Sequence, residues 1–153
     1  MTEHLDDKAR GMLHEANLYR TEARVAILSV LLKAAGPLRQ DQIGVQVADQ
    51  ASKGPPRQAS HLGSLSKVTV YRTLDSLVEA GLVHRAFMHN RTWHFELADH
   101  CSQQQCHPHF TCTRCGVTQC MTDISLPLAR IPRKGFVISR QQVRLEGLCP
   151  ACT

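Results

Sequence analysis

The sequence has few aromatic residues, no long apolar run and no cysteine in its first hundred positions. Aromatic residues make up 5% of the 153 residues, too few for a stacking platform that binds single-stranded nucleic acid. No apolar run approaches the roughly 18 residues that a membrane-spanning helix needs. Residues 1–10 contain acidic side chains and lack the apolar core of a secretory signal. We therefore expect a cytoplasmic protein without a membrane partner.

Acidic residues are scarce in the last third of the chain. Residues 101–153 carry six Lys and Arg but only two acids, Asp123 and Glu146, whereas residues 1–100 carry 12 bases and 11 acids. The net charge of +5 permits an anionic partner such as nucleic acid without indicating one. Because the two halves differ so much in composition, we expect two domains.

The first half has the pattern of helices followed by a β-hairpin. Apolar spacing predicts helices over residues 6–18, 21–35, 40–50 and 67–80, and strands over 82–87 and 92–97. In the third helix Ile43, Val45 and Val47 are expected to face inward, and residues 51–65 are expected to form a loop. Ser66 is a candidate N-cap and Gly81 a candidate left-handed stop for the fourth helix. This order is typical of a winged helix-turn-helix, which we place at residues 1–98.

The helix expected over residues 67–80 has a polar face whose residue types suit duplex DNA. Lys and Arg bind phosphates, and Tyr and Thr can contact the thymine methyl group in the major groove. The face consists of Lys67, Thr69, Tyr71, Arg72 and Asp75. Polar helix faces also occur in bundles that never touch DNA, so this pattern alone leaves a structural role equally open.

All seven cysteines lie after residue 100, and four of them form two C-x-x-C motifs. The pairs are Cys112 with Cys115 and Cys149 with Cys152, separated by 33 residues. Each pair can present two thiolates from one turn, and two pairs make the tetrahedral four-cysteine cage that Zn²⁺ favours. A redox dithiol would require a thioredoxin-like context that is missing. The odd cysteine count and a reducing compartment favour metal binding over a disulfide framework.

The segment around the first C-x-x-C pair predicts a small metal-held domain with a second ligand cluster. His107 and His109 lie two apart on an expected strand, which puts both imidazoles on one side. His84 and Glu96 lie on the hairpin, and Cys101 and Cys106 lie just before the strand. A lone histidine is usually structural, but this clustering favours a second metal site. The expected elements of this domain are strands over 110–112, 117–121, 136–138 and 143–148, with a short helix over 123–133.

A series of motifs in fixed order carries a family resemblance from about Leu18 to Cys152. They are T-V-Y-R at residues 69–72, L-V-E-A-G-L-V at 77–83, F-E-L at 95–97, H-x-H-x-x-C-x-x-C-G at 107–116, G-F at 135–136 and G-x-C-x-x-C at 147–152. This series resembles the ferric uptake regulator superfamily. The resemblance implies an α+β protein: an N-terminal winged-helix domain, a hinge at about 97–106, and a small C-terminal α/β dimerisation domain at 107–153.

The resemblance also implies how such a protein would bind DNA. It would be a homodimeric, metal-activated repressor of palindromic operators in double-stranded DNA, not an enzyme, and without a small-molecule substrate. Tyr71 and Arg72 match the family residues that face DNA. Arg24 matches the arginine of a T-x-x-R motif that contacts the DNA backbone, and Arg20 can replace a basic residue that enters the minor groove.

Departures from the family pattern bear on which metal is sensed. Iron-type members have a histidine where Gly36-Pro37-Leu38 stands, and the positions of their auxiliary site match Cys106, Pro108, Pro127 and Gln141 here. His84 matches a ligand of the zinc-type branch, whereas Glu96 is the residue usual in iron sensors. Abundant thiols favour Zn²⁺ over Fe²⁺ or Mn²⁺. The chain is therefore identified as most similar to the zinc uptake branch.

We accordingly expect two zinc ions per chain, one structural and one regulatory. The structural ligands are Cys112, Cys115, Cys149 and Cys152. The regulatory ligands are His84, Glu96, His107 and His109, with Cys101, Cys106 and Cys120 as alternates. An iron- or peroxide-sensing regulator of the same superfamily stays open. A zinc hydrolase is a remote alternative: His94-x-Glu96 followed by Cys112-x-x-Cys115 is similar to a deaminase signature, but the second C-x-x-C pair would fill the open position that hydrolysis needs.

Overall fold

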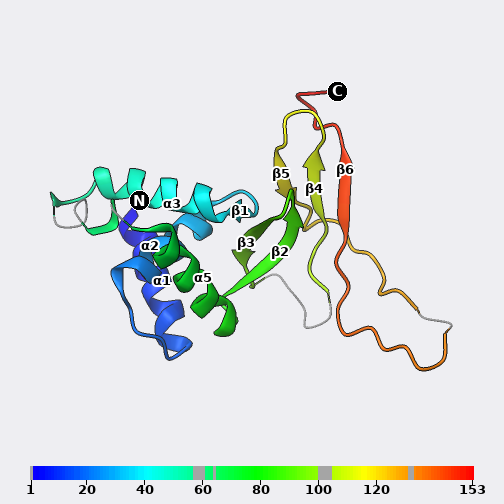
Figure 1. Cartoon of the computed structure of the whole chain (residues 1–153), viewed down its shortest axis with the longest axis horizontal. Coiled ribbons are helices and arrows are strands. Elements are labelled where there is room, and N and C mark those ends of the chain that lie inside the picture. The colour runs from blue at the N-terminus through cyan, green and yellow to red at the C-terminus, as the bar shows by residue number, and fades with distance from the viewer. Residues whose placement is uncertain (1, 57–60, 64, 100–104, 131–132) are drawn as a thin grey trace. The chain divides into compact units, whose positions relative to one another are not determined.

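The structure is a computed structural model of the chain and describes residues 2–56, 61–63, 65–99, 105–130 and 133–153 (Figure 1). It divides into two compact units, Met1–Ala98 and Asp99–Thr153. Within the described parts of the chain, none of the helices has the length and apolar character to cross a membrane.

Helices form most of the N-terminal unit and enclose its core. They are α1 (Thr2–Glu15), α2 (Glu22–Lys33), α3 (Gln40–Ser52) and α5 (Lys67–Glu79). The predicted N-cap at Ser66 is confirmed: its side chain accepts a hydrogen bond from the Thr69 amide at 3.1 Å. The Thr21 side chain caps α2 in the same way and accepts a hydrogen bond from the Arg24 amide at 3.3 Å. Each cap satisfies an amide that has no partner within the helix. The inward faces meet in a core that includes Leu13, Ile27, Leu28, Ile43, Leu74 and Leu77, all fully buried.

An antiparallel sheet completes the N-terminal unit. It contains β1 (Leu38–Arg39), β2 (Val83–His89) and β3 (Thr92–Leu97) in the order β1-β3-β2. Gly81, at a φ of +74°, follows the end of α5, as predicted, because glycine adopts this left-handed conformation without a steric cost. The order of helices followed by a β-hairpin is the one that the sequence predicts for this unit.

Two expectations about α3 and the segment after it are wrong. Val45 is 70% exposed, whereas Ile43 and Val47 are buried, because side chains four apart share a helix face and the one between them points away. Residues 51–65 are not simply a loop: Pro56, His61 and Leu62 are helical, and Leu62 belongs to the core. Residues 57–60 and 64 lie outside the described residues.

The C-terminal unit is built on a second small sheet. Its strands are β4 (His109–Cys112), β5 (Thr118–Cys120) and β6 (Arg144–Gly147), in the order β5-β4-β6. β4 pairs antiparallel with β5 and parallel with β6, where Cys112 lies opposite Gly147. The Phe110 ring lies 3.4 Å from where a Cβ of Gly147 would stand, so β6 passes close to β4 at the residues that precede the second C-x-x-C pair.

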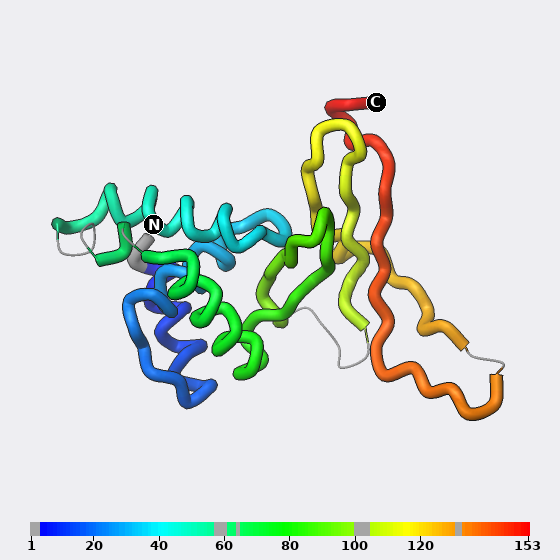
Figure 2. The backbone as a smooth tube through the Cα atoms, in the orientation of Figure 1, coloured from blue at the N-terminus to red at the C-terminus, as the bar shows by residue number. Residues whose placement is uncertain are grey.

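The helix expected over residues 123–133 and the strand expected over 136–138 are wrong for the described residues. Residues 123–130 and 133–138 are irregular backbone between β5 and β6 (Figure 2). The Gln141 side chain accepts a hydrogen bond from the Ala129 amide at 2.6 Å and donates one to the Pro127 carbonyl at 3.1 Å. Pro127 has no amide hydrogen to give to a helix, and the side-chain amide of Gln141 bonds the backbone groups that a helix would use.

Candidate metal centres and nucleic-acid interface

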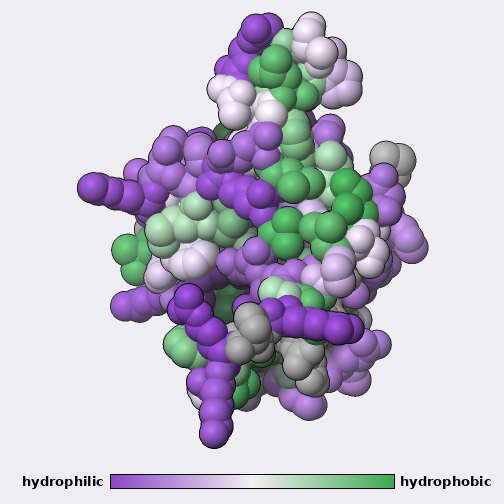
Figure 3. Space-filling view, turned by 90° about the vertical axis from the view of Figure 1, so that its right-hand side faces the viewer, coloured by the Kyte–Doolittle hydropathy of each residue, from purple (hydrophilic) through white to green (hydrophobic). Residues whose placement is uncertain are grey.

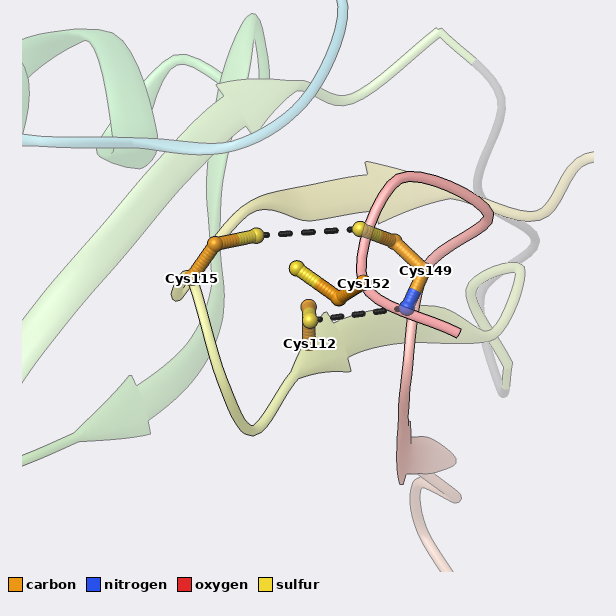
Figure 4. Close-up of side chains that lie close together, drawn as sticks. All are labelled: Cys112, Cys115, Cys149 and Cys152. Carbon is orange, nitrogen blue, oxygen red and sulfur yellow. Dashed lines mark hydrogen bonds between the residues drawn. The ribbon is translucent and has the colours of Figure 1, made fainter.

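The four cysteines of the two C-x-x-C motifs form one cluster in the C-terminal unit (Figure 4). Cys112 ends β4, and the turn after it is closed by a 2.9 Å hydrogen bond from the Gly116 amide to the Cys112 carbonyl. The second pair follows β6 in a turn where the Cys152 amide donates to the Cys149 carbonyl at 2.8 Å. The pairing of β4 with β6 therefore brings together two turns that are far apart in sequence.

The sulfur positions fit a tetrahedral zinc ion. All four Sγ atoms lie within 4.8 Å of one another, and those of Cys115 and Cys149 are 3.7 Å apart. Zn–S bonds of about 2.3 Å in a tetrahedron place sulfurs about 3.8 Å apart. The cluster therefore needs only small adjustments to hold the ion, and four sulfurs would leave no open position for a substrate.

Hydrogen bonds divide the protons unequally within the cysteine cluster. Backbone amides, that of Cys115 foremost and then that of Cys149, lower the pKa of Cys112 to about 6; the Cys149 amide lies 3.4 Å from the Cys112 sulfur. Hydrogen bonding to the sulfurs of Cys115 and Cys149 raises the pKa of Cys152 to about 12. At neutral pH the metal-free cluster thus holds a thiolate at Cys112 and a thiol at Cys152.

A histidine–carboxylate pair is buried on the hairpin of the N-terminal unit. His84 on β2 lies opposite Glu96 on β3, and the His84 Nε2 is 2.7 Å from the Glu96 Oε1. Both side chains are less than a tenth exposed. Burial of two such groups is costly unless they are paired or bind a metal, so this pair is a structural ion pair or a set of preplaced ligands.

A second set of ligand types lies in the C-terminal unit. The rings of His107 and His109 have centroids 4.7 Å apart, and Cys120 on β5 lies opposite His109 on β4. Ligand atoms of all three residues lie within 4.8 Å of one another. Two imidazoles and a thiol at this spacing are a suitable donor set for zinc.

Cys106 departs from the expectation that the thiols stay free. It is disulfide-bonded, whereas Cys112, Cys115, Cys120, Cys149 and Cys152 are free. Its sulfur lies 3.6 Å from the Nδ1 of His107. Cys101, the other alternate ligand in this segment, lies outside the described residues.

The outward face of α5 carries the residues expected to bind DNA. Lys67, Thr69, Tyr71 and Arg72 are all exposed. The hydroxyl groups of Thr69 and Ser66 are joined by a 2.9 Å hydrogen bond. None of the described carboxylates pairs with Lys67 or Arg72, so both cations are available to phosphates.

The other two expected DNA-binding arginines lie before α2 and within it. The Arg24 guanidinium donates to the Tyr19 carbonyl and to the Ser76 hydroxyl, both at 3.0 Å. It therefore holds the start of α2 against α5, a contact that sequence reasoning missed because the partners are 52 residues apart. Arg20 is exposed.

A second connection to α5 was also missed from the sequence. The Arg85 guanidinium on β2 donates to the Asp75 carboxylate of α5 at 2.5 Å. Arg85 follows His84 directly, so the strand that carries the buried histidine is anchored to the helix that carries the polar face. No local pattern signals this pair, because it depends on where β2 lies relative to α5.

Comparison with known proteins identifies the family. The profile of the Ferric uptake regulator family matches residues 15–145, more than four fifths of the chain. The chain belongs to the ferric uptake regulator family. It is therefore a metal-responsive transcription regulator that binds DNA and metal, and because members of this family are not enzymes, the zinc hydrolase alternative is excluded.

Solved structures of ferric uptake regulator family proteins share the fold. The Helicobacter pylori ferric uptake regulator, described as having three functional metal binding sites, superposes with a TM-score of 0.60 at 17% identity over 99% of this chain and 93% of that one. A zinc uptake regulator complexed with zinc and DNA gives 0.61 at 22%, over 99% and 94%. The Vibrio cholerae ferric uptake regulator gives 0.59 at 22%, over 92% and 98%. A search of the curated proteins found no match.

The similarity does not separate the branches of the ferric uptake regulator family. The iron- and zinc-named relatives have nearly equal identity to this chain. The metal that this regulator senses therefore has to be argued from its own ligands.

Proposed function

We propose that this protein is a zinc-responsive transcriptional repressor that binds palindromic operator DNA as a homodimer in the cytoplasm. The observation that supports it best is the thiol of Cys120 beside His107 and His109, within 4.8 Å of both. A thiolate in the sensing set would select zinc over the harder iron and manganese ions. The zinc uptake regulator of similar fold is bound to zinc and to DNA.

The structural role is assigned to the four-cysteine cluster. Cys112, Cys115, Cys149 and Cys152 would bind one zinc ion, which supplies cross-links between the two turns. Support comes from the 3.7 Å spacing of two of the sulfurs and from the lowered pKa of Cys112, since zinc binds thiolates.

The regulatory role is assigned to His84, Glu96, His107 and His109, with Cys101, Cys106 and Cys120 as alternate ligands; Cys106 is disulfide-bonded and would bind metal only as a reduced thiolate. His84 and Glu96 are already paired at 2.7 Å, and the two histidines of the C-terminal unit have neighbouring rings. These ligands come from both units, so a shared ion would restrict the hinge between them. The metal would then favour the arrangement that binds DNA by its higher affinity for it.

Operator recognition is assigned to α5 of each protomer. Tyr71, Thr69 and Arg72 would contact base edges, Lys67 and Arg24 would contact the DNA backbone, and Arg20 would enter the minor groove. Two such helices in a dimer reach successive major grooves about one helical turn apart, which is why the operator would be palindromic.

Apolar surface on the C-terminal unit supports the homodimer. Hydrophobic patches interrupt the hydrophilic surface on the face shown in Figure 3. Exposed apolar side chains of this unit are Val117, Leu126, Leu128, Phe136, Val137 and Leu148, with Val137 at 91%. Exposed apolar surface of this kind marks association sites.

An iron- or manganese-responsive regulator is the second candidate, because Glu96 offers a carboxylate oxygen, which these harder ions accept. The deciding experiment strips the full-length protein with a chelator and titrates Zn²⁺, Fe²⁺ or Mn²⁺ during selection from a random duplex library. The proposal expects one tightly held zinc per chain and a second that switches DNA binding on. DNA binding restored by iron or manganese and not by zinc would contradict the zinc assignment. DNA binding that ignores every metal would contradict metal regulation at the hinge.

A further inference from the structure

A carboxylate on α5 lies between two arginines that can each bind it. The Arg85 guanidinium of β2 donates to the Asp75 carboxylate at 2.5 Å, and the two side chains are 32% and 35% exposed. Arg72 precedes Asp75 by three residues on the same helix, a spacing at which side chains of opposite charge are neighbours. None of the described carboxylates pairs with Arg72. Asp75 therefore has a second possible partner on its own helix.

The partner that Asp75 takes decides whether Arg72 is available to DNA. While Arg85 holds the carboxylate, as in this structure, the Arg72 guanidinium can bind a base edge or a phosphate. A carboxylate released by Arg85 would be partly buried without a counter-charge, a costly state that pairing with Arg72 relieves. Arg72 would then be occupied, and the negative charge beside it would repel phosphates. Arg85 thus acts on DNA binding without touching DNA.

Contacts on both faces of the hairpin position Arg85. His84 and Arg85 are consecutive on β2, so their side chains point to opposite faces of the sheet. On one face the His84 Nε2 is 2.7 Å from the Glu96 Oε1 of β3. On the other face the Arg85 guanidinium lies 5.9 Å from the centroid of the Phe95 ring. Arg85 therefore reaches α5 from a strand position next to a proposed metal ligand.

A bulge makes the position of Arg85 depend on that ligand pair. The register of β2 against β3 shifts between Arg85 and Phe87. Such a bulge leaves a residue outside the ladder of hydrogen bonds and bends the strand locally. The ladder beyond the bulge therefore holds Arg85 less firmly than an unbroken one would. On the near side of the bulge, the first cross-strand side-chain contact is the buried pair of His84 and Glu96.

We propose that Arg85 couples this ligand pair to the DNA-binding helix by keeping the Asp75 carboxylate away from Arg72. As ligands of one ion, His84 and Glu96 would cross-link the two strands beside Arg85 and hold it against Asp75. Without that cross-link the carboxylate passes part of the time to Arg72, and DNA binding weakens. Arg85 is thus a positioning residue. The inference rests on the proposed metal-regulated DNA binding and names the residues that carry regulation to α5.

The first test is the DNA affinity of the full-length protein with and without the regulatory zinc, while the tightly held zinc stays bound. The probe is a duplex that wild-type protein selects from a random library. Without regulatory zinc, Asp75→Asn is expected to bind it about five- to tenfold more tightly than wild type, because no carboxylate remains to occupy Arg72. Glu79→Gln is the matched control: it removes the same charge from an exposed position one turn further along α5. It should change both zinc states by the same factor.

Arg85→Gln is expected to have the opposite effect and to be rescued. With regulatory zinc it should bind the duplex about five- to tenfold more weakly than wild type, because Asp75 is released to Arg72. Adding Asp75→Asn should restore the affinity, since the competing carboxylate is gone. If Arg85 only braced the fold, the second substitution could not restore DNA binding, and absence of rescue would overturn the inference. Should Arg85→Gln fail to fold, Asp75→Asn alone decides.

Zinc affinity provides an independent readout. Linkage requires the duplex to raise the affinity for regulatory zinc by the same factor by which zinc raises the affinity for the duplex. In Asp75→Asn this factor should be about five- to tenfold smaller than in wild type, and in Glu79→Gln it should be unchanged. A factor unchanged in Asp75→Asn would overturn the inference and leave metal-regulated DNA binding intact. Wild-type protein without any such factor would overturn the proposed function and this inference with it.

Discussion

The two units of the molecule are stabilised in different ways. The N-terminal unit has a core of large aliphatic side chains and Phe95. In the described part of the C-terminal unit, no Leu, Ile, Val or Phe is buried; its buried residues include Cys106, His109, Cys112 and Cys149. Because apolar burial is the main driving force of folding, the first unit can fold by itself. We expect the second to depend on bonds between sulfur and metal.

Cys149→Ser tests whether the C-terminal unit depends on bound metal, and it has the largest expected effect. A structural cysteine-rich site contributes on the order of 10–16 kcal/mol, more than the stability of most domains. The variant should lose one zinc per chain, and the C-terminal unit should become sensitive to protease while the helical signal of the N-terminal unit persists. Cys120→Ser is the matched control, since it lies outside the four-cysteine cluster and should leave that unit resistant. Equal resistance of Cys149→Ser and wild type would refute the metal-held fold.

His84→Ala separates regulation from structure. The His84 side chain is buried beside Glu96. Loss of a residue that only orients a metal ligand lowers the metal affinity by up to about 100-fold. Loss of a ligand itself should lower it at least as much. We expect the zinc concentration that half-restores DNA binding to rise by about that factor, with the tightly held zinc retained. His61→Ala is the control, because the His61 side chain is 69% exposed. An unchanged zinc response in His84→Ala would contradict the assignment of this ligand.

A pair of valine variants tests whether apolar burial stabilises the N-terminal unit. Val47 is 1% exposed and Val45 is 70% exposed on the same helix. Val47→Ala should lower the free energy of unfolding by about 1.5–3 kcal/mol, whereas Val45→Ala should change it by less than about 0.5 kcal/mol. Urea unfolding followed by circular dichroism measures both. Adding a chelator should not change the difference in unfolding free energy between the two variants. If that difference vanished without metal, the core of the N-terminal unit would also depend on the ion.

The pH dependence of zinc binding gives the smallest expected effect. Above pH 6 Cys112 is a thiolate, because its pKa is lowered to about 6, while Cys152, with its pKa raised to about 12, holds a proton. Zinc must displace the Cys152 proton at neutral pH and the Cys112 proton as well below pH 6. The affinity should therefore fall as the pH falls, and the fall should steepen by about tenfold per pH unit below pH 6. Competition with a chelating dye between pH 5 and 8 measures the slope; a constant slope would contradict the unequal sharing of protons.

Much of the fold could be predicted because local chemistry decides it. Thr21, Ser66 and Gly81 mark helix ends through hydrogen bonds and a left-handed turn, which depend only on neighbours in sequence. The two C-x-x-C pairs predicted one cluster because each turn presents its own two sulfurs. The family motifs, which occur in a fixed order, likewise predicted the winged-helix architecture.

The errors lie where distant contacts decide the structure. The side chain of Gln141 bonds the backbone of residues 127–129, so the helix expected there does not form. Arg24 with Ser76 and Arg85 with Asp75 connect elements whose separation in sequence gives no sign of contact. Counting cysteines could not reveal that Cys106 is disulfide-bonded, because pairing depends on geometry.

Hydrogen exchange measured by mass spectrometry, with and without a strong chelator, tests the difference between the two units most directly. Removal of the metal should abolish amide protection in β4, β5 and β6 while protection in α2, α3 and α5 stays within about tenfold of its original level. Loss of protection in both units together would show one cooperative fold and contradict the account. Full protection of the C-terminal strands without metal would show that apolar and hydrogen-bonded contacts alone hold that unit.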